Sequence, residues 1–262
     1  MNSSTIHGPI HLHYEHISGP GRPLVLVHPI GASIRFWDAL LPHLGTRAHV
    51  MRYDLRGHGG SDVPPGDYRL SEFVDDLLDL ADALDMDAFD VCGVSLGGMV
   101  AMAAAARVPS RINNVVVCSS ASRVSAPPQG WDGRRDAALS AGMRPLAGPM
   151  VERMFSEAFR SSGDPMVGLL RSVFEDMNPV GYGGACAILR DADLTNELPE
   201  VRSNTLVVSG ALDPLCPPEK ARALADALPN ARYEALECGH LPPVERPEEF
   251  AALLLSHCQL EK

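Results

Sequence analysis

The chain has 262 residues, of which 45% are hydrophobic and 21% are charged, and its formal net charge is −11. This length and composition predict one globular domain with room for an insertion. The negative charge argues against nucleic acids and anionic membrane surfaces as partners, and an anionic substrate would need local arginine or lysine. No run approaches the roughly 18 apolar residues that a membrane span needs.

The amino terminus and the cysteines bear on location. Residues 1–9 are polar and lack the basic and apolar regions of a signal peptide. The six cysteines are scattered, with no C-x-x-C pair and no spacing typical of metal ligands. Together these features indicate reduced thiols and a cytoplasmic protein.

Strand-like and helix-like segments alternate along most of the chain. The predicted strands cover residues 11–17, 24–27, 50–53, 89–92, 115–118, 205–208 and 231–236. The predicted helices cover residues 36–44, 70–84, 96–107, 218–228 and 247–258. Several of the strands are continuous apolar runs, which are typical of strands buried on both faces. The alternation predicts an α/β fold, with a mostly parallel sheet flanked by helices.

The stretch from residue 122 to residue 196 interrupts this alternation. It has no clear buried strand, is rich in Gly, Pro, Met and Arg, and holds helix-length pieces at 132–143 and 149–159. We interpret it as a helical cap over the carboxyl edge of the sheet. The core domain would then comprise residues 1–121 and 197–262.

Residues 93–97, Gly-Val-Ser-Leu-Gly, lie between a predicted strand and a predicted helix. Small residues on both sides of Ser95 allow a strained turn that presents its hydroxyl to solvent. The pattern is typical of a nucleophile elbow, although an ordinary strand-to-helix turn is the alternative.

A serine nucleophile needs a base and a group that orients the base. His240 follows the last predicted strand in a loop marked by Gly and Pro, which favours it among ten histidines. Asp213 follows the preceding strand, in the chain order serine, acid, histidine. The alternatives are a packed loop histidine and an aspartate that caps a loop.

The oxyanion of such a reaction needs backbone N–H donors close to the serine. Leu96, directly after Ser95, would supply one donor at a helix amino terminus. The loop after the strand at 24–27 would supply the other from Ile30, because Pro29 has no N–H. We expect His28 to shape this loop and to lie where the substrate binds.

Two other groups of polar residues have structural explanations. Asp54 and Arg56 stand in a glycine-rich loop after a strand, where they could tie neighbouring loops together. His11 and His13 could share one strand face and imitate a metal pair, but no carboxylate or thiol of matching geometry can be named. We therefore predict no metal site.

Residues 26–31, Trp37, the segment 53–61, the elbow, and the loops of Asp213 and His240 together resemble the α/β-hydrolase superfamily. The resemblance implies the α/β-hydrolase fold, a mostly parallel eight-stranded sheet with a helical cap insertion, and it implies no cofactor. Within the superfamily the chain is most similar to the 3-oxoadipate enol-lactonases of aromatic catabolism. The cap segments that carry this similarity are Trp131, 134–135, 142–143, 153–155 and 181–194.

The resemblance implies a serine hydrolase that opens a small lactone or enol ester, with this small molecule as its partner and a homo-oligomer left open. A substrate carboxylate would need a cation in the cap, where Arg134, Arg135, Arg153 and Arg190 are available. We favour Arg134, together with Trp131, for substrate binding.

One departure from the lactonase pattern supports a competing hypothesis. Met154 stands where those enzymes usually have a tryptophan, which would suit a roomier pocket. The chain would then be a carboxylesterase or methyl esterase that acts on a larger secondary metabolite. A receptor on the same fold, with little or no hydrolysis, is a third possibility.

Overall fold

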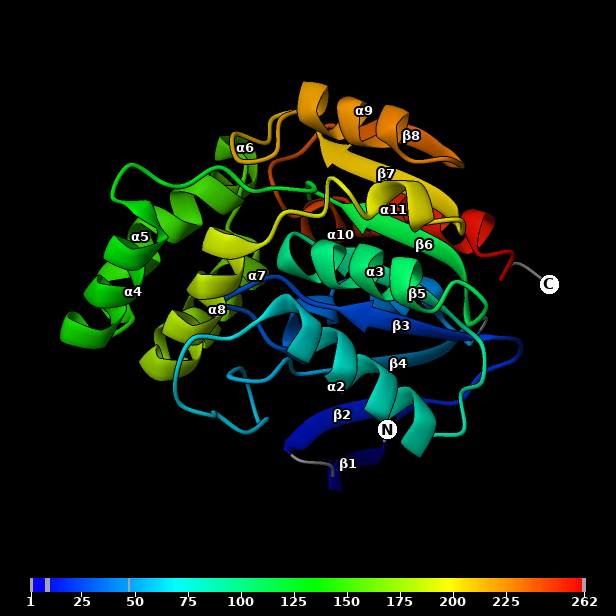
Figure 1. Ribbon diagram of the computed structural model, residues 1–262. Coiled ribbons are helices and arrows are strands. Elements are labelled where there is room, and N and C mark those ends of the chain that lie inside the picture. Colours follow the sequence, from blue (N-terminus) through cyan, green and yellow to red (C-terminus); the bar gives the residue numbers. More distant parts are fainter. Residues whose placement is uncertain (1, 8–9, 47, 261–262) are drawn as a thin grey trace.

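The computed structural model describes residues 10–46 and 48–260 and the backbone of residues 2–7. An eight-stranded sheet runs through the molecule in the order β1-β2-β4-β3-β5-β6-β7-β8 (Figure 1). The strands are β1 Asn2–His7, β2 His11–Ile17, β3 Pro23–Val27, β4 His49–Tyr53, β5 Phe89–Val94, β6 Ile112–Cys118, β7 Asn204–Gly210 and β8 Ala231–Leu236. Strand β2 is antiparallel to β1 and β4, whereas all neighbours from β4 to β8 are parallel. The predicted eight-stranded, mostly parallel sheet is confirmed.

Helices cover both faces of the sheet, and the strands divide their side chains between two apolar layers. Val25 and Val27 of β3 belong to the apolar layer that also holds α2 Leu70–Ala83, α3 Leu96–Arg107 and α9 Pro218–Ala227. Leu24 and Leu26 pack on the opposite face with α11 Pro247–His257 and the short helices η1 Ile34–Trp37 and α1 Leu41–Leu44. This explains the continuous apolar runs, since both faces of the central strands are buried.

The prediction of one helix over residues 36–44 is wrong. The chain forms η1 and α1 with a turn between them. Pro42 lies in the first turn of α1, the position in a helix where a proline fits best, and this favours a new helix beginning at Leu41. The edge strand β1 was not predicted, because residues 2–7 are polar and show no apolar alternation.

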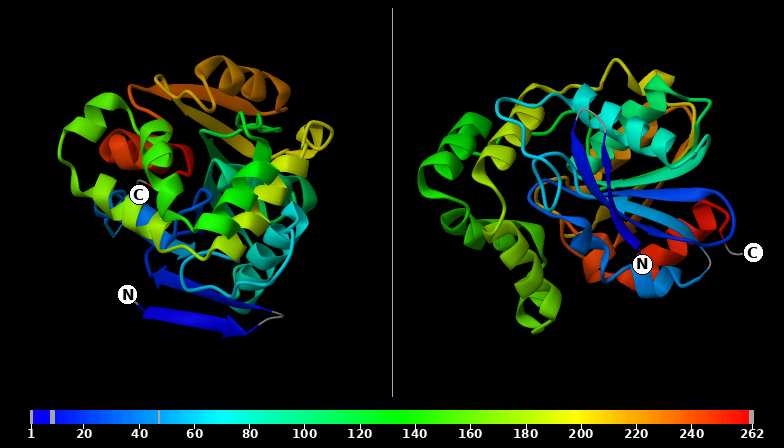
Figure 2. Two further views of the ribbon diagram at one scale, coloured as in Figure 1. Left: turned by 90° about the vertical axis from the view of Figure 1, so that its left-hand side faces the viewer. Right: turned by 90° about the horizontal axis from the view of Figure 1, so that it is seen from below.

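Between β6 and β7 the described chain forms helices and no strand. They are α4 Gly130–Ala141, α5 Arg144–Met154, α6 Glu157–Ser161, α7 Pro165–Glu175, α8 Pro179–Asp191 and η2 Leu198–Glu200. Helices α4 to α8 lie on one side of the molecule, beyond the carboxyl ends of the parallel strands (Figures 1 and 2). The exact division at residues 122 and 196 stays a prediction.

The predicted helix over residues 149–159 is also wrong. Helix α5 begins earlier, with a proline in its first turn, and ends at Met154. Ser156 then accepts a hydrogen bond from the Phe159 N–H and starts the separate helix α6. A serine in this position is a typical helix start, and it outweighs the apolar pattern that suggested continuity.

None of the helices in the described ranges is both long and apolar enough to cross a membrane. All six cysteines are buried and none forms a disulfide.

Candidate active site

The turn between β5 and α3 presents Ser95 to a cavity. Ser95 has φ 55° and ψ −114°, a backbone conformation that non-glycine residues rarely adopt. A Cβ on Gly93 would lie 2.0 Å from the Gly97 carbonyl oxygen, and a Cβ on Gly97 would lie 2.1 Å from that of Val27. The two glycines are therefore required by the close approach of α3 to strands β3 and β5.

Asp213 and His240 come together from loops that follow adjacent strands. His240 Nδ1 donates a hydrogen bond to Asp213 Oδ2 over 2.7 Å, and the two residues are 1% and 3% exposed. An ionised carboxylate can only accept hydrogen bonds, so His240 Nδ1 carries the proton and His240 Nε2 is free to act as a base. The His240 loop is also fixed by its backbone N–H, which donates to the Met154 carbonyl of the cap over 2.8 Å.

Asp213 is held in its charged form. Burial alone would raise its pKa, but the charge and hydrogen bond of His240 and two backbone N–H groups outweigh this, and the pKa is lowered. Those N–H groups belong to Leu215 and Cys216 and donate to Asp213 Oδ1 over 2.8 and 3.1 Å. The carboxylate is thus positioned to orient the imidazole of His240.

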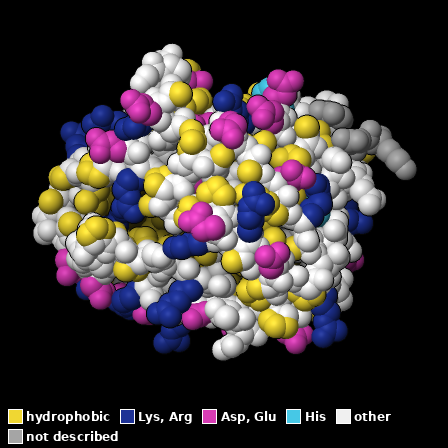
Figure 3. Space-filling view, turned by 90° about the horizontal axis from the view of Figure 1, so that it is seen from above, with side chains coloured by type: hydrophobic (Ala, Val, Ile, Leu, Met, Phe, Trp, Pro, Cys, Tyr) yellow, Lys and Arg dark blue, Asp and Glu magenta, His cyan; other side chains and the backbone are white. Residues whose placement is uncertain are grey.

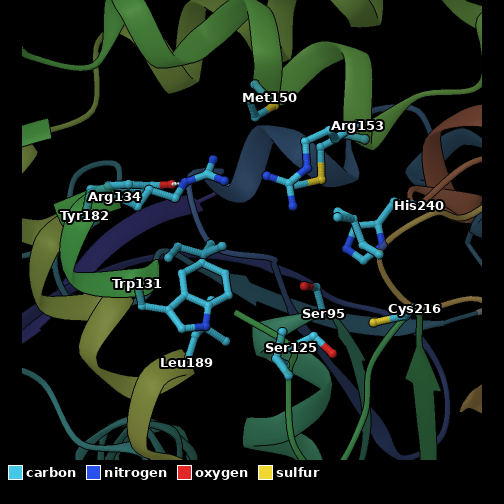
Figure 4. Close-up of a pocket in the computed structure, with 14 residues that line it drawn as sticks. Ser95, Ser125, Trp131, Arg134, Met150, Arg153, Tyr182, Leu189, Cys216 and His240 are labelled. Atoms are coloured by element: carbon cyan, nitrogen blue, oxygen red, sulfur yellow. Dashed lines mark hydrogen bonds between the residues drawn. The ribbon is translucent and has the colours of Figure 1, made fainter. Parts of the chain in front are cut away.

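Ser95 and His240 line the same cavity, as Figure 4 shows. Within the described residues, no hydrogen bond joins the Ser95 hydroxyl to the imidazole. In the absence of substrate, such contacts are often long or misaligned and shorten only in the reacting complex.

The loop after β3 places Ile30 at the cavity, and Leu96 is the first residue of α3. Hydrogen bonds from the segment 54–61 hold this loop in place. The Gly31 N–H donates to His58 Nε2 over 3.1 Å, and the Ile34 N–H donates to Asp54 Oδ1 over 2.6 Å. The expectation that the segment 54–61 ties loops together is confirmed for Asp54.

Burial, with the neighbouring His28, lowers the pKa of His58 to about 3. The ring is therefore neutral at ordinary pH and can accept the Gly31 N–H. Arg56 anchors the same segment to α2, through Asp76 and Glu72.

His28 does not contact the cavity, and the expectation that it binds substrate is corrected. Its side chain is fully buried. Nδ1 donates to the Pro29 carbonyl over 2.8 Å, and Nε2 accepts from the Leu55 N–H over 3.0 Å. Both ring nitrogens are used to join the two loops, so His28 shapes the loop and has no free polar atom for a ligand.

The cavity is bounded by the core on one side and by the cap on the other (Figure 4). Its lining comprises Ile30, Ser95, Val124, Ser125, Trp131, Arg134, Met150, Arg153, Met154, Tyr182, Leu189, Leu215, Cys216 and His240. About 50 Å³ of this cavity is open to the centres of water molecules. Met150 and Met154 both face this space, so the lost tryptophan does not leave a wide pocket.

The structure separates the four candidate arginines of the cap. Arg135 pairs with Asp132 and Asp136, each over 2.9 Å, and does not line the cavity. Arg190 is likewise paired, with three aspartates at 2.6 to 2.9 Å. Arg134 and Arg153 line the cavity instead.

Arg134 is held by Tyr182, a residue that the sequence analysis did not single out. Its Nε donates to the Tyr182 hydroxyl, and its guanidinium lies 5.6 Å from the centre of the ring. Tyr182 belongs to the stretch 181–194 that carried the family resemblance, but its partner depends on how α4 and α8 pack. Trp131, the other favoured residue, also lines the cavity.

One group of potential metal ligands occurs among the described residues, formed by Asp213, Cys216 and His240. Asp213 and His240 already bond to each other. Burial, and then the charge of Asp213, raise the pKa of the Cys216 thiol to about 12, so it is not a thiolate at neutral pH. We assign the group to the acid and base pair. At the amino terminus, His13 bonds to Asp54, and the side chain of His7 lies outside the described residues.

Comparison with known proteins shows the family. A family model described as the alpha/beta hydrolase fold matches residues 22–247. The chain belongs to this family. The hydrolase is 28% identical to 3-oxoadipate enol-lactonase 2 of Acinetobacter baylyi, over 91% of this chain and 90% of that one. It is 30% identical to a pimeloyl-[acyl-carrier protein] methyl ester esterase of Aromatoleum aromaticum, over 88% of this chain and 96% of that one.

Among solved structures, the enol-lactonase from Burkholderia xenovorans superposes with a TM-score of 0.92 and 31% identity, covering 96% of this chain and 97% of that one. The expected enzyme class, a carboxylic ester hydrolase, is confirmed.

Proposed function

We propose that this hydrolase opens a small lactone or enol ester by nucleophilic catalysis through Ser95, His240 and Asp213. The observation that carries the proposal is the 2.7 Å hydrogen bond from His240 to Asp213, at a cavity that Ser95 also faces from its strained turn. The likeness to enol-lactonases at 28% and 31% identity supports the substrate class.

The reaction begins when the Ser95 hydroxyl turns toward His240 and gives its proton to Nε2. Ser95 Oγ then attacks the carbonyl carbon, and the N–H groups of Ile30 and Leu96 stabilise the oxyanion. As the intermediate collapses, the protonated imidazole gives its proton to the leaving oxygen, which in a lactone stays attached to the acyl group. Water, deprotonated by His240, releases the acid and restores Ser95.

The substrate is small and carries an acid group on the cap side. The narrow cavity favours a compact lactone over a large metabolite ester. Arg134 is 8% exposed and, with Arg153, supplies positive charge on the cap side of the cavity, beside Trp131. The competing methyl esterase has a relative in its favour, but the methionines that fill the cap side argue against a roomy pocket.

Replacing Ser95 tests the proposal directly. We expect Ser95→Ala to lower kcat on a small enol-lactone by at least about 10⁴-fold while the melting temperature stays near that of the wild type. Ser140→Ala serves as the control, because Ser140 is an exposed residue of α4 outside the cavity. Turnover by Ser95→Ala at the wild-type rate would refute the mechanism. Tight binding of the lactone by the wild type without hydrolysis would favour a receptor.

A further inference from the structure

Two arginines face the cavity without counter-ions. Arg134 comes from α4 and Arg153 from α5, and their guanidinium groups point toward each other on the cap side (Figure 4). Within the described residues, neither is within ion-pair distance of a carboxylate, and none of the fourteen lining residues is Asp or Glu. The cavity therefore presents two positive charges that nothing in the described chain balances.

This arrangement differs from the surface of the same protein. On the face in Figure 3, basic and acidic side chains are interspersed. Arg135, the neighbour of Arg134, is surrounded by Asp67, Asp132 and Asp136. In a chain with a net charge of −11, carboxylates are plentiful, yet they are absent from this lining.

The two unbalanced charges affect each other. Burial, and then the positive charge of Arg134, lower the pKa of Arg153. Both groups still remain protonated, because a guanidinium does not lose its proton in proteins. Arg134 is buried and Arg153 is partly buried, and burying a guanidinium without a counter-ion costs free energy unless a ligand supplies the opposite charge. One carboxylate would balance one of the two charges, and the second would remain.

The hydrogen-bond donors that remain free fit two acid groups. Arg134 uses Nε for Tyr182, so its two Nη groups remain, and the guanidinium of Arg153 can offer its own pair of donors to a carboxylate. We propose, on the basis of the function proposed above, that Arg134 and Arg153 select substrates with two carboxylates besides the ester or lactone that is cleaved.

Three esters with one leaving group separate this selection from the chemistry. They are 4-nitrophenyl butyrate, mono-4-nitrophenyl glutarate and the mono-4-nitrophenyl ester of tricarballylate, with zero, one and two free carboxylates. We expect kcat/KM of the wild type to rise about tenfold or more with each carboxylate, as expected for hydrogen bonds between charged groups. Arg153→Met should abolish the second increase and retain the first.

Arg135→Met is the matched control, since Arg135 is adjacent in α4 and outside the cavity. It should leave the ratios between the three esters unchanged. The inference is overturned if the wild type does not prefer the dicarboxylate, or if Arg153→Met lowers kcat/KM on all three esters by the same factor. If no ester shows turnover that depends on Ser95, the proposed function fails instead.

Binding gives a readout that does not need turnover. In Ser95→Ala, calorimetry should show that glutarate binds about tenfold or more tightly than butyrate. The Ser95→Ala/Arg153→Met double variant should lose this difference. Equal affinities for glutarate and butyrate in Ser95→Ala would contradict the selection of two acid groups, whatever the kinetics show.

Discussion

Around the cavity, polar groups of the core and of the cap differ in whether the protein itself occupies their hydrogen-bonding atoms. In the core, Asp54, His58 and Asp213 have their hydrogen-bonding atoms occupied by ring or backbone partners. In the cap, Arg134 and Arg153 turn their guanidinium donors toward the cavity, and no carboxylate in the described chain receives them. Occupied groups are fixed in position, whereas unoccupied groups are available to a ligand. Under the proposed function, the core would carry out the chemical step and the cap would select the substrate.

Asp213→Asn tests the core side with the largest expected effect. An amide in place of the carboxylate no longer holds His240 with its proton on Nδ1, so kcat on a neutral ester should fall by about 10³- to 10⁴-fold. Asp193→Asn, at an exposed aspartate of the cap, should leave kcat unchanged. A fall of less than about tenfold for Asp213→Asn would mean that the acid lies elsewhere.

Gly97→Ala and Gly168→Ala compare the packing of the two regions. A Cβ at Gly97 would strike the Val27 carbonyl at 2.1 Å, whereas a Cβ at Gly168 of α7 would have no heavy atom within 4 Å. Urea denaturation should show a loss of about 3 kcal/mol in the free energy of unfolding for Gly97→Ala. The free energy of unfolding of Gly168→Ala should rise by about 0.5–1 kcal/mol, because alanine favours a helix more than glycine does. Equal effects at the two positions would remove the distinction in packing.

Tyr182→Phe tests the cap side. It removes the hydroxyl that accepts from Arg134 Nε, so the guanidinium loses its fixed orientation. Steady-state kinetics should show KM for a carboxylate-bearing ester raised about tenfold, with kcat retained and the neutral ester unaffected. An equal loss of kcat on the neutral ester would instead make Tyr182 part of the reacting site.

His13→Gln should have the smallest effect, with a defined dependence on pH. The hydrogen bond to Asp54 is the main cause that raises the pKa of His13. A raised folded pKa means that the stabilisation is fully present below the unfolded pKa near 6.5 and is lost as the pH rises through the folded value.

Since the pair is partly exposed, the free energy of unfolding of the wild type should exceed that of His13→Gln by less than about 1 kcal/mol at pH 5.5. The difference should be smaller still at pH 9. Chemical denaturation at the two pH values measures this difference. A difference that grows toward pH 9 would contradict the charge pairing.

The sequence alone determined the features that depend on local pattern. Apolar runs, alternating polarity and the regular order of elements predicted seven of the eight strands, and the small residues around Ser95 predicted the sharp turn. Asp213 and His240 could be found because loops after parallel strands meet at one edge of the sheet. The predicted helix boundaries were less accurate near Pro42 and Ser156, because a proline and a capping serine start new helices there within an apolar pattern that suggested one continuous helix.

The tertiary structure decided which polar side chains are available to a ligand. Arg134 and Arg135 are adjacent in the sequence, yet one faces the cavity and the other faces aspartates. Successive residues of a helix point about 100° apart, so the packing of α4 against α8 separates them. In the same way, His28 was predicted to bind substrate, but the two loops that it joins occupy both ring nitrogens. The partners of a side chain come from distant parts of the chain, and only the folded structure brings them together.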